Sequence, residues 1–302
     1  MNLVGPRELP GFPTMFPFLL RKVWTSIAPR RGARLVPYDR QALEHNPSIT
    51  WIGHSTMLVR MDGVTFLTDP VFSQRASPVS FAGPKRLVPP GVPLEELPPI
   101  DFALLSHDHY DHTDIPSIRE LARRGTRFVV PLNMGELVRD AGGEALELDW
   151  WQDVKIGRVR VYCVSAQHFS GRSALGGHNR RLWAGWVVAG PTRRFYHAGD
   201  TGYFTGFAEI GKRLGPIDLA AIPIGAYRPR SIMRFVHLNP DEAIQAAADL
   251  GATHVIGMHF GTFDLTDEPP NEPPRRFHAA AARYGFDPDR AWTFDVGESR
   301  DW

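Results

Sequence analysis

Six of the eight positions from His107 to Asp114 are histidine or aspartate, three of each. They follow an apolar run in the stretch LLSHDHYDHTD, which predicts a buried strand that ends at a loop. A solvated loop does not need histidine, and a core strand rarely contains aspartate. Imidazole and carboxylate are ligands that suit zinc, and also iron or manganese. The stretch therefore predicts a metal site.

The spacing inside this loop can serve two cations. His107 and His109 lie two residues apart, so their side chains point the same way on an extended backbone. Asp111 and His112 follow at once, where a turn can direct them to a second point. Two imidazoles would then bind one cation, and a carboxylate with an imidazole would bind the other.

One loop does not fill two coordination shells, so further ligands must come from later in the chain. Three candidates, His168, Asp200 and His259, end apolar segments and precede loops, where folds place functional residues. Asp200 could bridge two metals through its two oxygens. A single histidine at a strand end is usually structural, so these three depend on the loop for their interpretation. An ordinary structural role is assigned to His45, His178, His254 and His278.

The segments around these residues predict sheets with helices outside them. Residues 48–70 read as two strands around an Asp62-Gly63 turn. Further apolar segments predict strands within 101–106, 127–131, 159–166, 182–190, 194–200, 217–227 and 253–260. Helices are predicted within 117–125, 240–252 (with Asn239 as N-cap) and 273–285. Strands that come first and then alternate with helices indicate a layered α/β domain.

Composition excludes several classes of protein. The chain has 302 residues, of which 43% are hydrophobic, and a net charge of +1, so no global field favours a nucleic acid partner. Its one cysteine, Cys163, excludes an internal disulfide framework and fits a reducing compartment. No apolar run approaches the roughly 18 residues of a membrane span. We therefore expect a cytoplasmic protein.

The N-terminal residues 1–47 are predicted to form an arm before a single domain of residues 48–302. Residues 11–34 mix aromatic and aliphatic side chains with arginine and lysine, and Pro13 and Pro17 break any long helix. One interpretation is an arm packed on the domain. The other is an interfacial segment that touches anionic lipid at the inner membrane surface.

These residues carry a resemblance to a known family. His-x-His-x-Asp-His at 107–112, then His168, Asp200 and His259, resembles the ligand set of the metallo-β-lactamase fold, an αββα sandwich with a dinuclear centre between two mixed sheets. Longer blocks, from about residue 48 to 300, are similar to the N-acylphosphatidylethanolamine-hydrolysing phospholipase D branch of this fold. They include WIGHSTMLVRMDGVTFLTDPVFSQRASP, GPKR, ELPPIDFALLSHDHYDH, ELDWW, AGDTGYF, EIGKRLGPIDLAAIPIGAYRPR, HLNPDEA and HFGTF.

The resemblance implies two Zn²⁺ per chain, with iron or manganese as alternatives. One metal would be bound by His107, His109 and His168, the other by Asp111, His112 and His259, and Asp200 would bridge them. Asp111 and Asp200 would thereby be catalytic, together with His237, which matches a histidine that the branch keeps near the substrate phosphate. Asp69 matches an aspartate that steadies the ligand loop. From the sequence alone His237 and Asp69 read equally well as structural residues.

Other positions are less defined. His54 is expected to support the ligands or to be structural. Tyr227 and Arg230 are conceivable phosphate contacts, although a solvated loop is the preferred interpretation. Residues 171–181 do not match the branch and are expected to line the entrance to the site.

The resemblance implies phospholipase D-type hydrolysis of an N-acylphosphatidylethanolamine-like lipid to an N-acylethanolamine and phosphatidic acid. The expected partners are this phospholipid-like substrate, a membrane surface and a second copy in a homodimer, with no nucleic acid. An alternative keeps the site and changes the substrate to a lactone, a β-lactam or a soluble phosphodiester. Two alternatives of other classes are a di-iron redox protein and a zinc-stabilised binding protein without activity.

Overall fold

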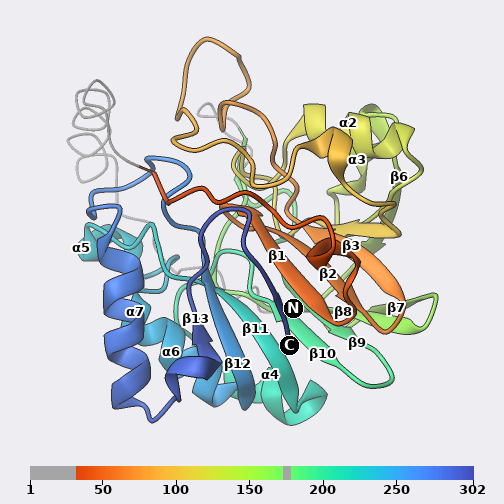
Figure 1. The fold of residues 1–302 in the computed structure, drawn as a ribbon. Helices are drawn as coiled ribbons and strands as arrows, with labels where there is room; N and C mark the ends of the chain where they lie inside the picture. The colour runs from red at the N-terminus through yellow and green to blue at the C-terminus, as the bar shows by residue number, and fades with distance from the viewer. Residues whose placement is uncertain (1–31, 173–177) are drawn as a thin grey trace.

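The computed structural model describes residues 32–172 and 178–302 as two packed β-sheets with helices on their outer faces (Figure 1). The first sheet has the order β14-β1-β2-β3-β4-β5-β6, with strands Ser299–Asp301, Ser48–Gly53, Thr56–Met61, Val64–Thr68, Phe102–Leu104, Arg127–Pro131 and Glu144–Leu148. The second has the order β13-β12-β11-β10-β9-β8-β7, with strands Ala291–Trp292, Ala252–Met258, Ile217–Pro223, Arg194–His197, Gly185–Ala189, Val159–Val164 and Asp153–Ile156. Each sheet contains parallel and antiparallel pairs. The predicted αββα sandwich of mixed sheets is confirmed.

Helices cover both outer faces. The α-helices are α2 (Ile115–Arg123), α3 (Gly135–Asp140), α4 (Gly206–Leu214), α5 (Arg230–Met233), α6 (Pro240–Asp249) and α7 (Glu272–Arg283). Three short 3₁₀ helices are η1 (Ala42–Glu44), η2 (Leu94–Glu96) and η3 (Pro288–Arg290). In Figure 1, α2 and α3 lie beside the first sheet, while α4, α6 and α7 lie beside the second. Asn239 caps α6 as predicted, because its side chain accepts from Glu242 N and the Glu242 side chain accepts from Asn239 N.

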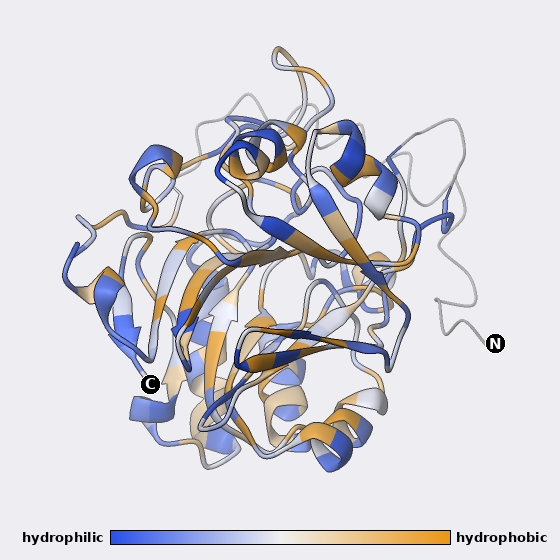
Figure 2. Ribbon diagram, turned by 90° about the vertical axis from the view of Figure 1, so that its right-hand side faces the viewer, coloured by the Kyte–Doolittle hydropathy of each residue, from blue (hydrophilic) through white to orange (hydrophobic). Residues whose placement is uncertain are grey.

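The central strands of each sheet, such as β1, β3, β4 and β11, are buried on both faces, which explains their apolar character. In β3, Phe66 faces the second sheet and stacks on Phe102 with ring centroids 4.9 Å apart. The next residue, Leu67, points to the opposite face and packs in the cluster under α2 and α3 that contains Leu121. Figure 2 shows hydrophobic residues along the strands of both layers. The two sheets therefore hold their end loops rigidly relative to one another.

Residues 48–70 form three strands, so the prediction of two was wrong. The Asp62-Gly63 turn is confirmed, with φ of 50° and 81°. A second tight turn divides the preceding segment after Gly53, and His54 adopts a φ of 56° there. No glycine or asparagine follows Gly53 to signal the turn. The turn directs His54 toward the edge where the predicted ligands lie.

The described part of the predicted arm pairs with the C-terminal segment. Val36 N donates to Val296 O at 2.9 Å, and Val296 N donates to Arg34 O at 2.8 Å. Residues 1–31, which include most of the expected lipid-facing segment, lie outside the described residues. Within the described ranges, no helix is both long and apolar enough to span a bilayer.

Candidate metal centre

The loops that follow four strands meet at one edge of the sandwich. The first loop follows β4 and carries His107 to His112, and the others follow β8, β10 and β12. These later loops carry His168, Asp200 and His259 respectively. The structure thus brings all seven predicted ligands to one place, in groups whose donor atoms lie within 4.8 Å of one another.

The first group consists of His107, His109 and His168. His109 Nδ1 lies 2.8 Å from His107 Nε2 and 3.3 Å from His168 Nε2. Ligand nitrogens about 2.0–2.1 Å from a tetrahedral zinc ion are about 3.3 Å apart. The three nitrogens therefore have the spacing of ligands that share one ion.

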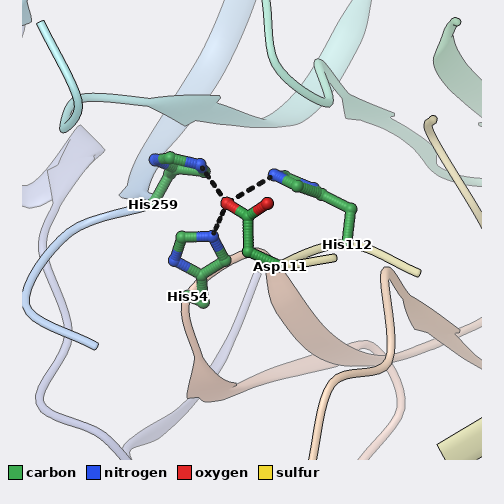
Figure 3. Close-up of side chains that lie close together, drawn as sticks. All are labelled: His54, Asp111, His112 and His259. Carbon is green, nitrogen blue, oxygen red and sulfur yellow. Dashed lines mark hydrogen bonds and ion pairs between the residues drawn. The ribbon is translucent and has the colours of Figure 1, made fainter. Parts of the chain in front are cut away.

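The second group surrounds Asp111, as Figure 3 shows. Asp111 Oδ2 lies 3.6 Å from His112 Nε2 and 3.5 Å from His259 Nε2. His54 Nε2 is closer still, at 3.0 Å from the same oxygen. His54 was expected only to support the ligands or to be structural, and its contact with Asp111 fits a supporting role. His54 also stays within reach of a bound ion.

Asp200 lies between the two groups. Its Oδ2 is 3.1 Å from His112 Nε2 and 3.9 Å from both His107 Nε2 and His168 Nε2. Its Oδ1 is 3.2 Å from His259 Nε2. Asp200 is thus the one carboxylate among the predicted ligands whose oxygens approach histidines of both groups, which is the position expected of a bridging ligand.

Buried polar atoms at this edge lack hydrogen-bond partners among the described residues. They include His112 Nε2, His259 Nε2 and Asp200 Oδ1. Their contacts with one another, such as the 3.2 Å between His259 Nε2 and Asp200 Oδ1, are ion pairs without hydrogen-bond geometry, and buried polar atoms left in this way fit a common partner. A divalent cation accepts lone pairs from both atom types, so the residues fit a metal.

The charges of the two groups differ. Burial lowers the pKa of His107 and His168 well below the usual range, so both rings are neutral and have a free lone pair. Burial also acts to lower the pKa of His259, but Asp200 and Asp111 raise it to about 9. The pKa of His112 is likewise raised, since the nearby carboxylates outweigh burial. Without metal, protonated His112 and His259 therefore balance the negative charge of the carboxylates around them. Metal binding would release these protons.

Hydrogen bonds on the far side of three of the rings, those of His107, His112 and His168, direct the nitrogens that face the centre. His112 Nδ1 lies 2.8 Å from Asp69 Oδ2, and His168 Nδ1 lies 2.9 Å from Val236 O. His107 Nδ1 lies 2.9 Å from Ser106 Oγ. A proton on each Nδ1 leaves the lone pair of Nε2 pointing to the centre.

Asp69 contacts several of the residues that orient these rings, in agreement with the role that the resemblance implied. It is fully buried and accepts from Ser106 N and Ser106 Oγ, both at 2.7 Å. His197 Nε2 also lies 3.1 Å from its Oδ2. Burial alone would raise the pKa of Asp69, but His112 and His197 keep it below the usual range. Sequence reasoning missed Ser106 and His197, although a histidine inside the apolar segment RFYHAG was a usable signal.

We expect Asp69→Asn to weaken metal binding by about 10- to 100-fold, the usual effect of losing a residue that orients a ligand. An amide has one oxygen, so it cannot accept from Ser106 and from both histidines together. Competition with a chromophoric chelator measures the affinity. Asp140→Asn, at the exposed end of α3, is the matched control. Wild-type affinity in a folded Asp69→Asn protein would contradict this role.

His237 lies beside the centre. Its Nδ1 is 3.9 Å from Asp200 Oδ2, and its ring centroid is 5.2 Å from that of His168. The side chain is buried, and Nδ1 has no hydrogen-bond partner among the described residues. Burial lowers the pKa of His237 to about 4. His237 is therefore placed to contact a molecule bound at the centre.

The structure changes the interpretation of Tyr227 and Arg230. Tyr227 is fully buried and its hydroxyl donates to Glu272 Oε1 at 2.6 Å, so it belongs to the core and the preferred solvated loop was wrong. Arg230 Nη1 donates to His237 O at 2.9 Å, and Arg230 Nη2 donates to Glu242 Oε1 at 2.6 Å. Arg230 thus holds the His237 backbone against α6.

The described part of the 171–181 segment is attached to the ligand loop. Gly171 N donates to Asp108 Oδ1 at 2.6 Å, and Arg181 Nη1 lies 3.3 Å from Asp108 Oδ2. Arg172 Nη1 donates to Asp108 O at 2.8 Å. Residues 173–177 lie outside the described residues, so the expectation that this segment lines the entrance stays a prediction.

Comparison with known proteins gives matches over most of the chain. The family described as "Beta-lactamase superfamily domain" matches residues 65–260. The chain is 46% identical, over 229 residues, to N-acyl-phosphatidylethanolamine-hydrolyzing phospholipase D 1 of Caenorhabditis elegans. The matched region covers 72% of this chain and 64% of that protein.

A second named relative is more distant. The chain is 34% identical, over 259 residues, to N-acyl-phosphatidylethanolamine-hydrolyzing phospholipase D, mitochondrial, of Saccharomyces cerevisiae. The matched region covers 83% of this chain and 55% of that protein. The chain thus spans 64% and 55% of the lengths of these two relatives.

Among solved structures, the isothiocyanate hydrolase from Delia radicum gut bacteria shares the fold. It has a TM-score of 0.67 and 18% identity, and the match covers 84% of this chain and 100% of that one.

Proposed function

The chain belongs to the beta-lactamase superfamily, and from this premise we propose that it is a dinuclear zinc hydrolase that cuts the phosphodiester bond of N-acylphosphatidylethanolamine-like lipids. The products would be an N-acylethanolamine and phosphatidic acid. The observation that carries the proposal is the position of Asp200 between two groups of converging ligands. The two named phospholipase D relatives support the choice of substrate.

The ligands divide between two ions. His107, His109 and His168 would hold one, Asp111, His112 and His259 would hold the other, and Asp200 would contact both. When bound, divalent cations supply Lewis acidity toward a phosphoryl oxygen and lower the pKa of water. The absence of cysteine from the ligand set is compatible with zinc, and also with iron or manganese.

The remaining residues would orient the substrate and hold its charge. His237 Nδ1, buried and without a partner among the described residues, would donate a hydrogen bond from its neutral ring to a phosphate oxygen or to the departing alkoxide oxygen. Arg230 would keep His237 in place through its backbone carbonyl. Phosphoryl transfer depends mostly on positioning and electrostatics, so no protein nucleophile is required.

The test combines metal content with lipid turnover. The purified chain is assayed for metal by emission spectrometry and incubated with N-acylphosphatidylethanolamine micelles. Close to two zinc ions per chain and release of N-acylethanolamine would support the proposal. Two metals with cleavage only of lactones, β-lactams or soluble diesters would keep the hydrolase and discard the lipid substrate. Iron with redox activity, or bound metal without any turnover, would contradict the hydrolase.

We expect His237→Asn to lower kcat by about 10²- to 10³-fold, the usual effect of losing one hydrogen-bond donor to the charge that develops in the transition state. The bound metal should stay unchanged, since the seven ligands remain. His254→Asn, on β12 away from the centre, is the control. Loss of metal from the His237→Asn protein would instead make His237 a ligand.

A further inference from the structure

One loop presents a large apolar side chain to solvent. Phe81 is 81% exposed, the highest value for any large hydrophobic residue that the structure describes, and Val79 beside it is 38% exposed. Both lie in residues 73–85, within the long connection between β3 and β4. This connection is drawn in orange in Figure 1 and projects from the top of the molecule. Exposed apolar side chains on a protruding loop commonly mark an interaction site.

The 73–85 loop is held in shape by its own hydrogen bonds. Arg75 lies inside it and donates from Nε to Ser80 O at 3.1 Å and from Nη1 to Gly83 O at 2.6 Å. Ala76 N donates to Pro84 O at 3.0 Å and closes the loop. The tip is therefore preorganised, which reduces the entropy lost when it binds.

The base of the loop is attached to the candidate metal centre. Asp114, two residues after His112, accepts from Ser73 N at 3.1 Å and from Ser73 Oγ at 2.8 Å. A cavity of about 590 Å³ separates the loop from the segment that follows the ligands. Val79 of the loop and Tyr110, between His109 and Asp111 in the chain, both line it. A lipid held at the tip would thus lie beside the ligand loop.

The charge around the tip is positive. Arg75, Arg119 and Arg172 line the cavity, and Lys85 is exposed where the loop ends. The carboxylate that lines the cavity, Asp114, is buried and bonded to Ser73. Apolar side chains flanked by lysine and arginine suit the interface of an anionic bilayer, where each basic residue adds to binding.

We propose that the 73–85 loop is the surface by which the protein docks on an anionic phospholipid bilayer, with Phe81 and Val79 inserted between headgroups. The inference rests on the proposed lipid substrate, and it names the surface that would deliver that lipid to the centre. It differs from the expectation that residues 11–34 contact the membrane, because it requires no part of that segment.

The first test is co-sedimentation of the full chain with vesicles of phosphatidylcholine and phosphatidylglycerol. Phe81→Ser should weaken binding by at least about tenfold, the effect of one buried phenylalanine side chain. Tyr284→Ser removes another exposed aromatic ring, 47% exposed after α7, and should leave binding unchanged. Binding should also fall when phosphatidylglycerol is left out. Equal binding of wild type and Phe81→Ser would overturn the proposal.

A label reports on insertion directly. Cys163 is buried, so a thiol dye will react selectively at a cysteine introduced by Ser80→Cys. The fluorescence of an environment-sensitive dye there should shift to the blue on addition of vesicles, whereas a dye at Ala279→Cys on α7 should not respond. No shift at position 80, or dissociation of a dimer by Phe81→Ser without vesicles, would assign the tip to another partner and overturn the proposal.

Enzyme assays keep the two proposals separate. Phe81→Ser should cut vesicle-bound lipid more slowly but hydrolyse a dispersed short-chain lipid at the wild-type rate. If wild type cuts no lipid while vesicle binding still depends on Phe81, the proposed function fails and the docking surface stands. If the wild-type protein cuts lipid but Phe81→Ser does not weaken vesicle binding, the docking surface is refuted and the proposed function stands.

Discussion

Asp200→Asn is expected to reduce kcat/KM by more than about a thousandfold, since the metals it would bridge supply several kcal/mol of transition-state stabilisation. The reason is electrostatic. The carboxylate of Asp200 approaches the Nε2 atoms of His112 and His259 at 3.1 and 3.2 Å. Asparagine keeps the shape but loses the charge, and its NH₂ group would face a ring nitrogen or a cation. One of the two ions would then lose a ligand.

The measurement pairs steady-state kinetics at saturating zinc with metal content. Asp200→Asn should bind less than the wild-type amount of metal, or bind it without turnover. Asp140→Asn, far from the centre on α3, controls for a general effect of removing a carboxylate. Near-full activity of Asp200→Asn with metal bound would show that Asp200 bridges nothing.

Removal of the metal should abolish activity and lower thermal stability. Stripping removes the cations that would hold the buried rings of His112 and His259 and the carboxylate of Asp200 together. A ligand present at 1,000 times its Kd stabilises the folded state by about 4 kcal/mol. For a chain of 302 residues that corresponds to an increase in Tm of roughly 6 °C.

The experiment treats the protein with a chelator, removes the chelator and then adds back zinc, iron or manganese separately. Activity and Tm should return together with the native metal, at two ions per chain. The Asp69→Asn protein should need a higher metal concentration for the same recovery, which ties the support of the ligands to their affinity. Full activity after complete stripping would contradict a metal-dependent reaction.

The ligand set could be predicted because its signals are local. The six residues from His107 to His112 contain four candidate ligands and come soon after a buried strand, and apolar strands mark the positions of His168 and His259. Strand ends that share an edge of a sandwich bring such residues together without further information. The resemblance added the prediction that these residues divide between two ions.

Other features could not be read from the chain. The second turn after Gly53 depends on a positive φ at His54, and its consequence is a contact with Asp111, 57 residues later. Tyr227 looked like a loop residue, but in the core its hydroxyl donates a hydrogen bond to Glu272 of α7. The exposure of Phe81 is equally invisible in sequence, because nine of the fifteen phenylalanines that the structure describes are buried.

The sequence by itself determined the residue types at the centre, the strands that carry them and the cap of α6, because hydrophobic periodicity and side-chain chemistry act over a few residues. Only the tertiary structure decided which polar atoms are left without partners and which residues orient the ligands. It also decided which apolar side chain stays in water. Each of these depends on contacts between segments far apart in the chain, such as Asp69 with His197, and local sequence patterns carry no information about such contacts.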